Sequence, residues 1–523
     1  MNLNFFGGKK SRKRLFFQNA LILMAGSFAM RTLGLSFGVY LSGKMGAEGM
    51  GLFQLTATVY GLASTFATSG IYLTVTRLVA EEVAAANYAG ADDAMRKCMR
   101  YGLLVSFIAM FALFFSSEFV GVFLLGDSRT VLSLRILALA LPFMAFSSSL
   151  RGYFFALRMA GKSSAGQMVE QVAHMAVSIC AFSCFVPEGN LTLACAAAAL
   201  GCLGGELISF LFSLALYLRD KAHRHFQRKS SPDITRRMLR ITVPVALSTY
   251  LKSTLRTIEN LLIPRGFRKY GASGASALAQ YGMTEAMVMP VLTFPAAFLT
   301  SFSSLLVPEI AEARAKGDQA RISRITAKVL RYTLLFSAAM TGIFVFFSEQ
   351  LGWAVYRDNS VGSMLGLLAP LTPLMYLDNV ADAMLKGLDE QVSVLRYSIL
   401  DSAMSICMLW FLLPLYGVNG YIVVMFASTF LNSTLSLARL ATVTDLHIRP
   451  VEWILVPAVF ITISCNASSF LTNCLPPLNP VPDITVRIVL TLVFYLLLLL
   501  FSGFFRQNSL SPKRRRDTLS LLK

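Results

Sequence analysis

The chain has 523 residues, of which 55% are hydrophobic and only 14% are charged, and it carries a formal net charge of +19. An average soluble domain has about 25% charged residues, so this composition excludes an ordinary soluble protein and indicates an integral membrane protein. Isolated strands cannot satisfy their backbone hydrogen bonds in lipid, and no strand-like alternation appears, so the spans are predicted to be helices.

Apolar runs of about 18 to 28 residues recur along the chain, each long enough to cross a roughly 30 Å hydrocarbon core as a helix. We predict an all-α polytopic membrane protein with about 14 transmembrane helices. The predicted spans are 15–41, 50–76, 99–123, 131–157, 167–187, 191–218, 239–263, 276–305, 327–348, 363–385, 395–415, 418–439, 451–473 and 485–505. The first run is too long for the apolar core of a signal peptide, so we expect it to be retained as a helix.

Basic residues gather in alternate connections between these spans. They lie in KKSRKR near the N-terminus, in RDKAHRHFQRKSSPDITRRMLR from Arg219, in 314–328 and in the final PKRRR. The positive-inside rule therefore places both termini in the cytoplasm, as an even number of spans requires. The exceptions are Arg265, Arg268 and Lys269, which this topology places outside. Anionic inner-leaflet lipid accounts for most of the basic excess, so no nucleic-acid partner is expected.

An internal repeat divides the chain. LVAEEVAAANYAGADDAMRKCMRYGLL begins at Leu78, and LVPEIAEARAKGDQARISRITAKVLRYTLL begins at Leu306, about 228 residues later. A second pair, LPFMAFSSSLRGYFFALRMAGKSSAGQ and TPLMYLDNVADAMLKGLDEQ, supports the repeat. Repeats of about six spans with the same topology predict two lobes related by a pseudo-two-fold axis along the membrane normal, with a site at the lobe interface.

This repeat predicts four parts. Residues 1–218 form an N-terminal lobe, 219–238 a basic cytoplasmic linker and 239–441 a C-terminal lobe. Residues 442–523 hold two additional helices and a basic cytoplasmic tail, which have no counterpart in the repeat.

The stretch YLKSTLRTIENLLIP, which begins at Tyr250, places three charges on one face of a helix. Lys252, Arg256 and Glu259 are spaced i, i+4 and i+7, and Arg256 lies near mid-depth. A lone charge there costs about 2.5 to 3.5 kcal/mol, which argues for a water-filled interior. Arg31 is also central in the first helix. Three cations against one anion predict a pocket for an anionic headgroup such as a phosphate; the alternative is that Glu259 merely neutralises Arg256.

Further charged residues lie in other predicted spans. Asp378 and Asp382, one helical turn apart, are candidate ligands for a coupling cation. Pro290 and Pro295 interrupt the eighth span and predict a bent helix. Together with Glu285 of the same span, they are candidates for a coupling or gating role.

Three charges of the first lobe are predicted to be structural. Glu170 and Glu206 are expected to be buried and hydrogen-bonded rather than part of transport, and Arg151 is expected to snorkel to the cytoplasmic surface. Sequence motifs for nucleotide binding, metal binding or a catalytic nucleophile are absent. We therefore predict no catalytic residue, no metal, no cofactor and no enzymatic activity. Transport then draws on a gradient, the membrane potential or the cargo's own concentration difference.

Six motifs in chain order resemble those of a known family. They are MRTLGL, GAEGMGLFQL, TRLVAEE, LRGYFFALRMAGKSSAGQMVEQV, GGELISF and QYGMTEAMVMPVLTFPAAFLTSFSSLLVPEIAEA. From residue 15 to about 505 the chain resembles the bacterial stage V sporulation protein B family of polysaccharide-biosynthesis membrane proteins. That family belongs to the multidrug, oligosaccharidyl-lipid and polysaccharide exporter superfamily and is similar to the lipid II flippase.

The resemblance implies twelve helices in two six-helix lobes around a central cavity that opens alternately to the two sides. It implies that the unrepeated spans, 451–473 and 485–505, form a groove for a polyprenyl tail. It also implies that cations on the first helices of the two lobes face the cavity. Arg31, within MRTLGL, matches that pattern directly, whereas Lys252 and Arg256 match by helix and face.

The leading hypothesis is a flippase in the bacterial cytoplasmic membrane. It would move an undecaprenyl-diphosphate-linked cell-wall precursor, lipid II or another lipid-linked oligosaccharide, from the inner to the outer leaflet by alternating access. The expected partners are this anionic glycolipid, membrane lipids and a candidate monovalent cation, and the protein is expected to be a monomer. The alternatives are a cation-coupled multidrug exporter of the same superfamily and a non-transporting scaffold in cell-wall or spore-cortex synthesis.

Overall fold

The computed structural model describes residues 9–68, 70–187, 189–222, 233–444, 451–474 and 479–502. Within these ranges every regular element is a helix, which confirms the predicted all-α class. Nine helical stretches of the described chain are long and apolar enough to cross a membrane. The count of 14 spans stays a prediction. Most of the predicted linker and the final PKRRR lie outside the described residues.

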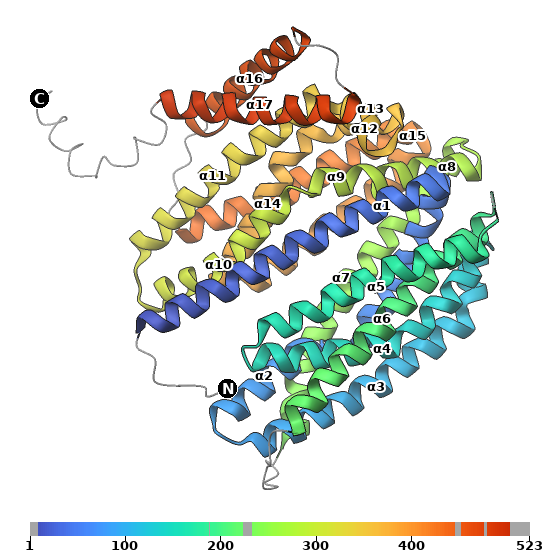
Figure 1. Cartoon of the computed structure of the whole chain (residues 1–523), viewed down its shortest axis with the longest axis vertical. Helices are drawn as coiled ribbons and strands as arrows, with labels where there is room; N and C mark the ends of the chain where they lie inside the picture. The colour runs from blue at the N-terminus through green and yellow to red at the C-terminus, as the bar shows by residue number, and fades with distance from the viewer. Residues whose placement is uncertain are drawn as a thin grey trace, which may run out of the picture. The chain divides into compact units, whose positions relative to one another are not determined.

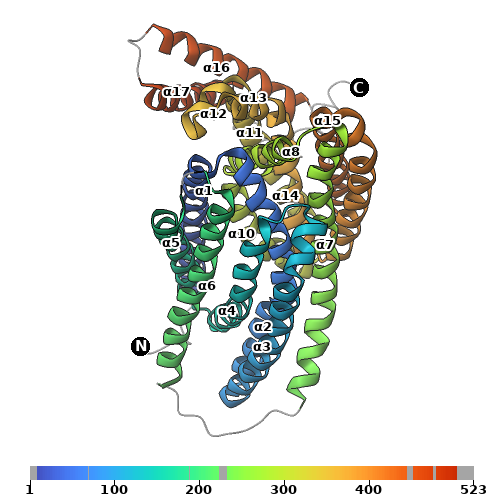
Figure 2. The same ribbon diagram turned by 90° about the vertical axis from the view of Figure 1, so that its right-hand side faces the viewer.

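The helices fall into two compact units. Figure 1 and Figure 2 show the helices coloured along the chain from the N-terminus to the C-terminus. The first unit contains residues 1–305 and 390–432, and the second contains residues 306–389 and 433–523. The helices of the first unit are α1 (Lys9–Thr68), α2 (Ile71–Ala84), α3 (Tyr88–Phe119), η1 (Val120–Leu124), α4 (Thr130–Ala156), α5 (Ala160–Phe185), α6 (Leu191–Ala222), α7 (Ile234–Tyr270), α8 (Gly274–Tyr281), η2 (Gly282–Val288) and α9 (Met289–Thr293).

The helices of the second unit are α11 (Gln319–Phe346), α12 (Ser348–Tyr356), α13 (Asn359–Leu368), η3 (Ala369–Leu371), α14 (Thr372–Gly387), η4 (Val451–Leu455), α16 (Val456–Asn473) and α17 (Pro480–Phe501). The chain passes between the units within α10 (Ala296–Ala315), between residues 389 and 390, and within α15 (Gln391–Thr444). In this unit α16 packs on α17 and on α11. The buried Tyr495 of α17 satisfies its hydroxyl by donating to the carbonyl of Leu335 in α11 at 3.0 Å.

The helices α3 to α6 of the first unit pack side by side (Figure 1). Helix α1 changes direction at Gly46, whose φ of 64° suits a residue without a Cβ atom. The residues after this bend, 47–68, are called the second segment of α1. The bend separates the first two predicted spans, and Gly417 (φ 57°) bends α15 in the same way between the eleventh and twelfth.

The internal repeat is visible in the backbone. Asn87 caps α3 by accepting from Gly90 N at 3.1 Å, and Asp318 caps α11 by accepting from Arg321 N at 3.0 Å. Each cap follows a residue with positive φ, and ten of the twelve positive-φ residues in the described chain form pairs about 230 residues apart. The pairs are Gly46 and Gly271, Ala86 and Gly317, Gly126 and Arg357, Arg158 and Asp389, and Gly189 and Gly417.

Four of these ten residues are not glycine, and the left-handed conformation costs such a residue about 1 to 2 kcal/mol. Non-glycine residues adopt this unfavourable conformation at equivalent turns of the two repeats. We infer that the turns are set by the helix order that the repeats share. The lobe boundaries at 218, 239 and 441 stay a prediction.

Helix α7 runs antiparallel to the second segment of α1 and to α2, and their contact is called the seam. Its side-chain hydrogen bonds join Asn260 to Thr58 (3.3 Å), Thr65 to Ser253 (3.2 Å) and Thr74 to Thr242 (2.9 Å). In each pair one residue comes from the first repeat and one from the second. Because polar side chains in an apolar environment need partners, these bonds fix the register of α7.

A glycine crossing joins the second segment of α1 to α8 and η2. A Cβ atom on Gly51 would lie 2.0 Å from the carbonyl oxygen of Leu278, and one on Gly282 would lie 2.2 Å from the carbonyl oxygen of Ala47. The two backbones therefore approach more closely than any side chain permits.

We predict that Gly51→Ala lowers the thermal unfolding midpoint in detergent, because the added methyl group must push the helices apart at a cost of about 1 to 3 kcal/mol. The matched control is Gly38→Ala in the same helix, since a Cβ atom there meets nothing within 4 Å. Equal midpoints for the two variants would contradict the crossing.

Candidate functional site

The predicted charged face of α7 lies beside the seam, because each of its three charges directly precedes a seam-facing or buried residue of the helix. Arg256 is exposed, whereas Lys252 and Glu259 are half-buried. No hydrogen bond or ion pair joins Arg256 to a residue in the described part of the chain, so Glu259 does not neutralise it by direct contact. The Oε1 atom of Glu259 is buried and has no hydrogen-bond partner among the described residues.

Arg31 lies against the break in the eighth predicted span. The break falls between α9 and α10, where Ala297 N bonds to the carbonyl of Phe294 in a tight turn instead of continuing the helix past Pro295. The carbonyl of Thr293 is thereby left for a side chain, and Arg31 donates to it from Nη2 at 2.9 Å. The predicted bend is thus present at Pro295, where it contacts Arg31, whereas Pro290 lies in the first turn of α9 and does not interrupt the helix.

Two more carboxylates lie near the charged face of α7. Glu285, in the π-helical η2, accepts a hydrogen bond from the Tyr421 hydroxyl, and Asp401 accepts one from Ser428 at 2.6 Å. Glu259 interacts electrostatically with Asp401, Arg256 and Glu285. The expectation of three cations against one anion is therefore corrected.

Asp401 was missed because spacing within one helix cannot show which distant residue packs beside it. The available signal was its position within the predicted span 395–415, where an acid is costly. Its hydrogen bond to Ser428, like that of Glu285 to Tyr421, comes from a neutral hydroxyl group. Neither Glu285 nor Asp401 therefore forms an ion pair with the guanidinium group of Arg256.

The two predicted acids of the second unit lie on α14. Asp382 accepts a hydrogen bond from Ser436 at 3.5 Å and lies 4.0 Å from Lys386, and Asp378 is half-buried one turn earlier. Among the described residues no three or more His, Cys, Asp or Glu side chains form a group able to hold a metal ion. A cation role for Asp378 and Asp382 stays a prediction.

The outer junction, named for the predicted topology, comprises residues 46–51, 123–129 and 265–282. Arg265 donates to the carbonyls of Phe123 and Leu124, and Arg268 donates to the carbonyl of Gly126 at 3.3 Å. Lys269 lies 4.4 Å from the ring centroid of Trp410. The three basic residues that oppose the positive-inside rule are thus held by carbonyls and an aromatic ring.

A wide-open cavity of about 590 Å³ lies at the outer junction, lined by Glu48, Asp127, Arg129 and Arg268 among others. Arg129 bridges the two acids, at 2.7 Å from Asp127 and 2.9 Å from Glu48. These hydrogen bonds, that of Asp127 foremost, raise the pKa of Arg129 above its usual value. Because Glu48 and Asp127 also line this cavity, its charge is mixed rather than purely positive.

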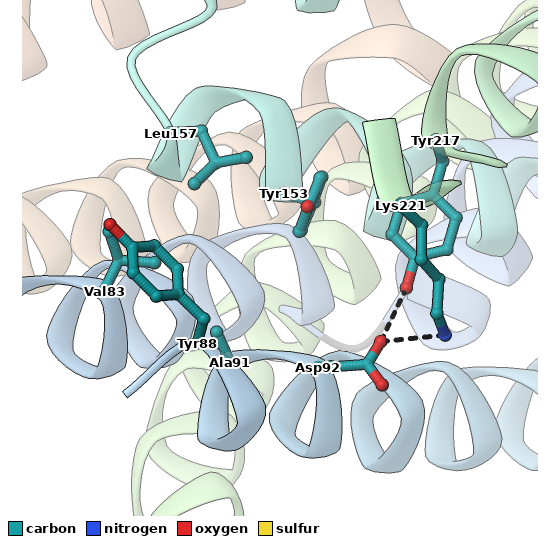
Figure 3. A pocket seen from close by; sticks show the side chains of 8 residues that line it. All are labelled: Val83, Tyr88, Ala91, Asp92, Tyr153, Leu157, Tyr217 and Lys221. Atoms are coloured by element: carbon teal, nitrogen blue, oxygen red, sulfur yellow. Dashed lines mark hydrogen bonds and ion pairs between the residues drawn. The ribbon is translucent and has the colours of Figure 1, made fainter. Parts of the chain in front are cut away.

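A second, much smaller pocket lies among α2, α3, α4 and α6 (Figure 3). Asp92 accepts a hydrogen bond from the Tyr217 hydroxyl at 3.2 Å and lies 3.0 Å from Lys221. This pocket has a volume of about 20 Å³, which is room for about one water molecule, so the pocket cannot receive a lipid headgroup.

At the other end of the seam, Arg237 of α7 binds both acids of the repeat motif. It lies 2.7 Å from Glu81 and 2.6 Å from Glu82, and Arg77 donates to Glu81 at 2.9 Å. The hydrogen bond from Arg77, followed by that from Arg237, holds the pKa of Glu81 below its usual value. Glu309, the counterpart of Glu81 in the second unit, pairs with Arg321 at 3.1 Å.

The helical fold, the backbone repeat and charges within apolar helices define a multi-pass membrane protein. The chain belongs to the polysaccharide biosynthesis protein family, whose model matches residues 16–313. It is 24% identical over 456 residues to the stage V sporulation protein B of Bacillus subtilis (strain 168), covering 86% of this chain and 88% of that protein. The resemblance drawn from the six motifs is thereby confirmed.

Other similar proteins are named as transporters. The lipid II flippase MurJ of Bacillus subtilis (strain 168) is 22% identical over 403 residues, 72% of this chain and 73% of that protein. A solved lipid II flippase MurJ in an inward closed conformation matches 93% of this chain and 99% of its own, with a TM-score of 0.65 and 13% identity. An inward-facing multidrug resistance transporter of the MATE family matches 82% of this chain and 99% of its own, with a TM-score of 0.61 and 15% identity. The structural matches establish the fold.

We predict that Arg237→Gln lowers the thermal unfolding midpoint at neutral pH, because it removes the ion pairs of Arg237 with Glu81 and with the buried Glu82. Since the pKa of Glu81 is lowered in the folded state, its share of the stability is present above about pH 4.3 and is lost as the pH falls further. The difference from wild type should therefore shrink in acid.

The matched control is Arg236→Gln, which removes an exposed neighbouring charge that has no ion pair with a described residue. Unfolding midpoints of wild type and both variants, measured across a pH series, check the prediction. A deficit for Arg237→Gln that does not change with pH would contradict it.

Proposed function

We propose that this protein is a flippase that moves an undecaprenyl-diphosphate-linked glycan, lipid II or a related precursor, to the outer leaflet by alternating access. The observation that carries the proposal is Arg256, an exposed guanidinium within a span that has no ion pair or hydrogen bond with a described residue. A guanidinium is suited to bind phosphate oxygens in pairs, because its donors form a planar fork.

Arg31 is the second cation of the proposed site. It is exposed and bonded to a backbone carbonyl rather than to a carboxylate, so its charge is not neutralised by that contact. Its hydrogen bond to Thr293 also connects it to the Pro295 break, which is the bend proposed to move during transport. A moving bend would shift the position of this cation together with the helix.

The membrane potential favours the proposed direction. An interior-negative potential drives an anion outward with about 2.3 kcal/mol per charge per 100 mV. A diphosphate headgroup carries more than one negative charge, so no nucleotide hydrolysis is needed. The cations replace part of the hydration that the headgroup loses, while the polyprenyl tail stays in lipid.

We predict that the wild-type protein restores externally accessible lipid II in a bacterium depleted of its own flippase, and that Arg256→Gln and Arg31→Gln do not. The matched control is Arg240→Gln, which removes an exposed arginine of α7 several turns away. Labelling of lipid II from outside the cell and the amount of membrane-inserted protein are measured together.

Normal lipid II labelling with both Arg256→Gln and Arg31→Gln would refute the proposed cationic binding site. Failure of the wild type itself, when it is present in the membrane, would exclude lipid II and leave other lipid-linked glycans as the cargo.

A second candidate, a cation-coupled exporter, is favoured by one observation. Glu259 has a buried oxygen with no hydrogen-bond partner among the described residues, and it interacts with Asp401 and Glu285. Such a group of acids suits a cationic substrate or a monovalent coupling ion. Proton- or sodium-dependent efflux of a cationic dye from vesicles, lost in Glu259→Gln, would select this candidate; its absence would leave the flippase.

A further inference from the structure

Helices α5 and α6 meet along a face of glycine residues. A Cβ atom on Gly201 would lie 1.7 Å from the Ser178 hydroxyl oxygen, and one on Gly205 would lie 2.9 Å from the carbonyl oxygen of Glu170. The same face of α6 carries Gly204, whose Cβ atom would meet Val177 at 2.9 Å. Close approach of two helices through small residues is typical of membrane proteins, and it brings the neighbouring side chains into a dry interface.

Glu206 follows these glycines and is buried near the middle of α6. Its residue is only 4% exposed, and its Oε2 atom has no hydrogen-bond partner among the described residues. It interacts with Glu170 of α5 and Arg151 of α4. The pair Arg151 and Glu170 is joined at 2.6 Å, with side chains 11% and 31% exposed. The expectation that Arg151 snorkels to the surface is therefore wrong, because Glu170 retains it inside.

Two carboxyl groups thus share one guanidinium. Glu170 holds Arg151 directly, so Glu206 has no ion pair of its own with a described residue. An ionised carboxylate that is buried without a partner is costly in a protein interior, whereas the protonated acid is not charged.

Within the described part of the chain, the other titratable groups near Glu206 supply no fixed positive charge. Tyr60 of α1 and Cys202 of α6 interact with it and are neutral in their protonated forms. His174 of α5 lies against Gly201 and Gly205, and its Nε2 atom is buried with no hydrogen-bond partner among the described residues. A proton on Glu206 is therefore the direct way to neutralise the site.

We propose that Glu206 is a proton-binding site in the first repeat and that its proton couples transport to the pH gradient. When the interface of α5 and α6 is dry, Glu206 holds a proton; when water reaches it, the carboxyl gives the proton to water and its charge is hydrated. No other bond changes. Water reaches the two carboxyl groups from the side of Glu170, because Glu170 is more exposed than Glu206. The coupling part of this proposal rests on the proposed flippase activity.

The proton site is tested without cargo, on the purified full-length protein. Infrared difference spectra between wild type and Glu206→Gln are expected to contain the C=O stretch of one carboxylic acid at neutral pH, and this band is expected to disappear in alkaline solution. The control variant is Glu118→Gln, which removes an exposed acid whose side chain is 75% accessible. A difference spectrum without a carboxylic acid band would overturn the proposal.

Coupling is tested in vesicles with the membrane potential clamped at zero. A pH difference across the membrane is expected to change the rate of glycolipid movement by wild type and by Glu118→Gln, by about tenfold at most per pH unit for one proton. Glu206→Gln is expected to move glycolipid at a rate independent of the pH difference. Glu206→Asp, which retains an acid, is expected to keep the response.

Three outcomes separate the parts of the argument. A pH response that persists in Glu206→Gln would overturn the coupling. A wild type that moves glycolipid without any pH response would do the same. Vesicles in which no variant moves glycolipid would refute the proposed function, while the infrared band still decides whether Glu206 binds a proton.

Discussion

The seam between α7 and the second segment of α1 is the contact on which the arrangement of charges depends. Its hydrogen bonds pair one residue of each repeat, from Thr58 with Asn260 to Thr74 with Thr242. A shift of α7 by one residue would break all of these hydrogen bonds at once. Because α7 turns about 100° per residue, the seam also decides that Lys252, Arg256 and Glu259 lie on the adjacent face rather than in the contact.

Backbone groups hold the two repeats together at the outer junction. At the glycine crossing, backbone carbonyl groups occupy the space that a Cβ atom on Gly51 or Gly282 would need. Arg265 and Arg268 bind backbone carbonyls at the end of η1 and just beyond it. Carbonyls at a helix end have no intrahelical partner, so they attract cations. The positive-inside rule counts charges without their partners and therefore could not anticipate three basic residues on this side.

Much of the fold was predictable because the determining signals are local. Hydrophobic length and the repeated motif predict helices and their order, and the left-handed turns recur where the repeat places them. Proline predicts the break after Thr293 for the same reason. The charge partners were not predictable, because they are distant in sequence: Asp401 approaches α7, and Glu170 holds Arg151. The amino-acid sequence shows that a charged residue lies within a span, but it does not show which distant residue neutralises that charge.

The two proposed sites are physically connected by the second segment of α1. On one side Tyr60 interacts with Glu206 and Cys202, and on another Thr58 and Thr65 bond to α7. In the proposed mechanism, a proton that leaves Glu206 would place a charge beside Tyr60 and change the hydration around it. Packed helices move as stiff bodies, so a displacement of the segment would act on the seam and hence on the position of Arg256. In the proposed mechanism the second segment of α1 would therefore transmit the loss of a proton at Glu206 to the proposed anion site at Arg256.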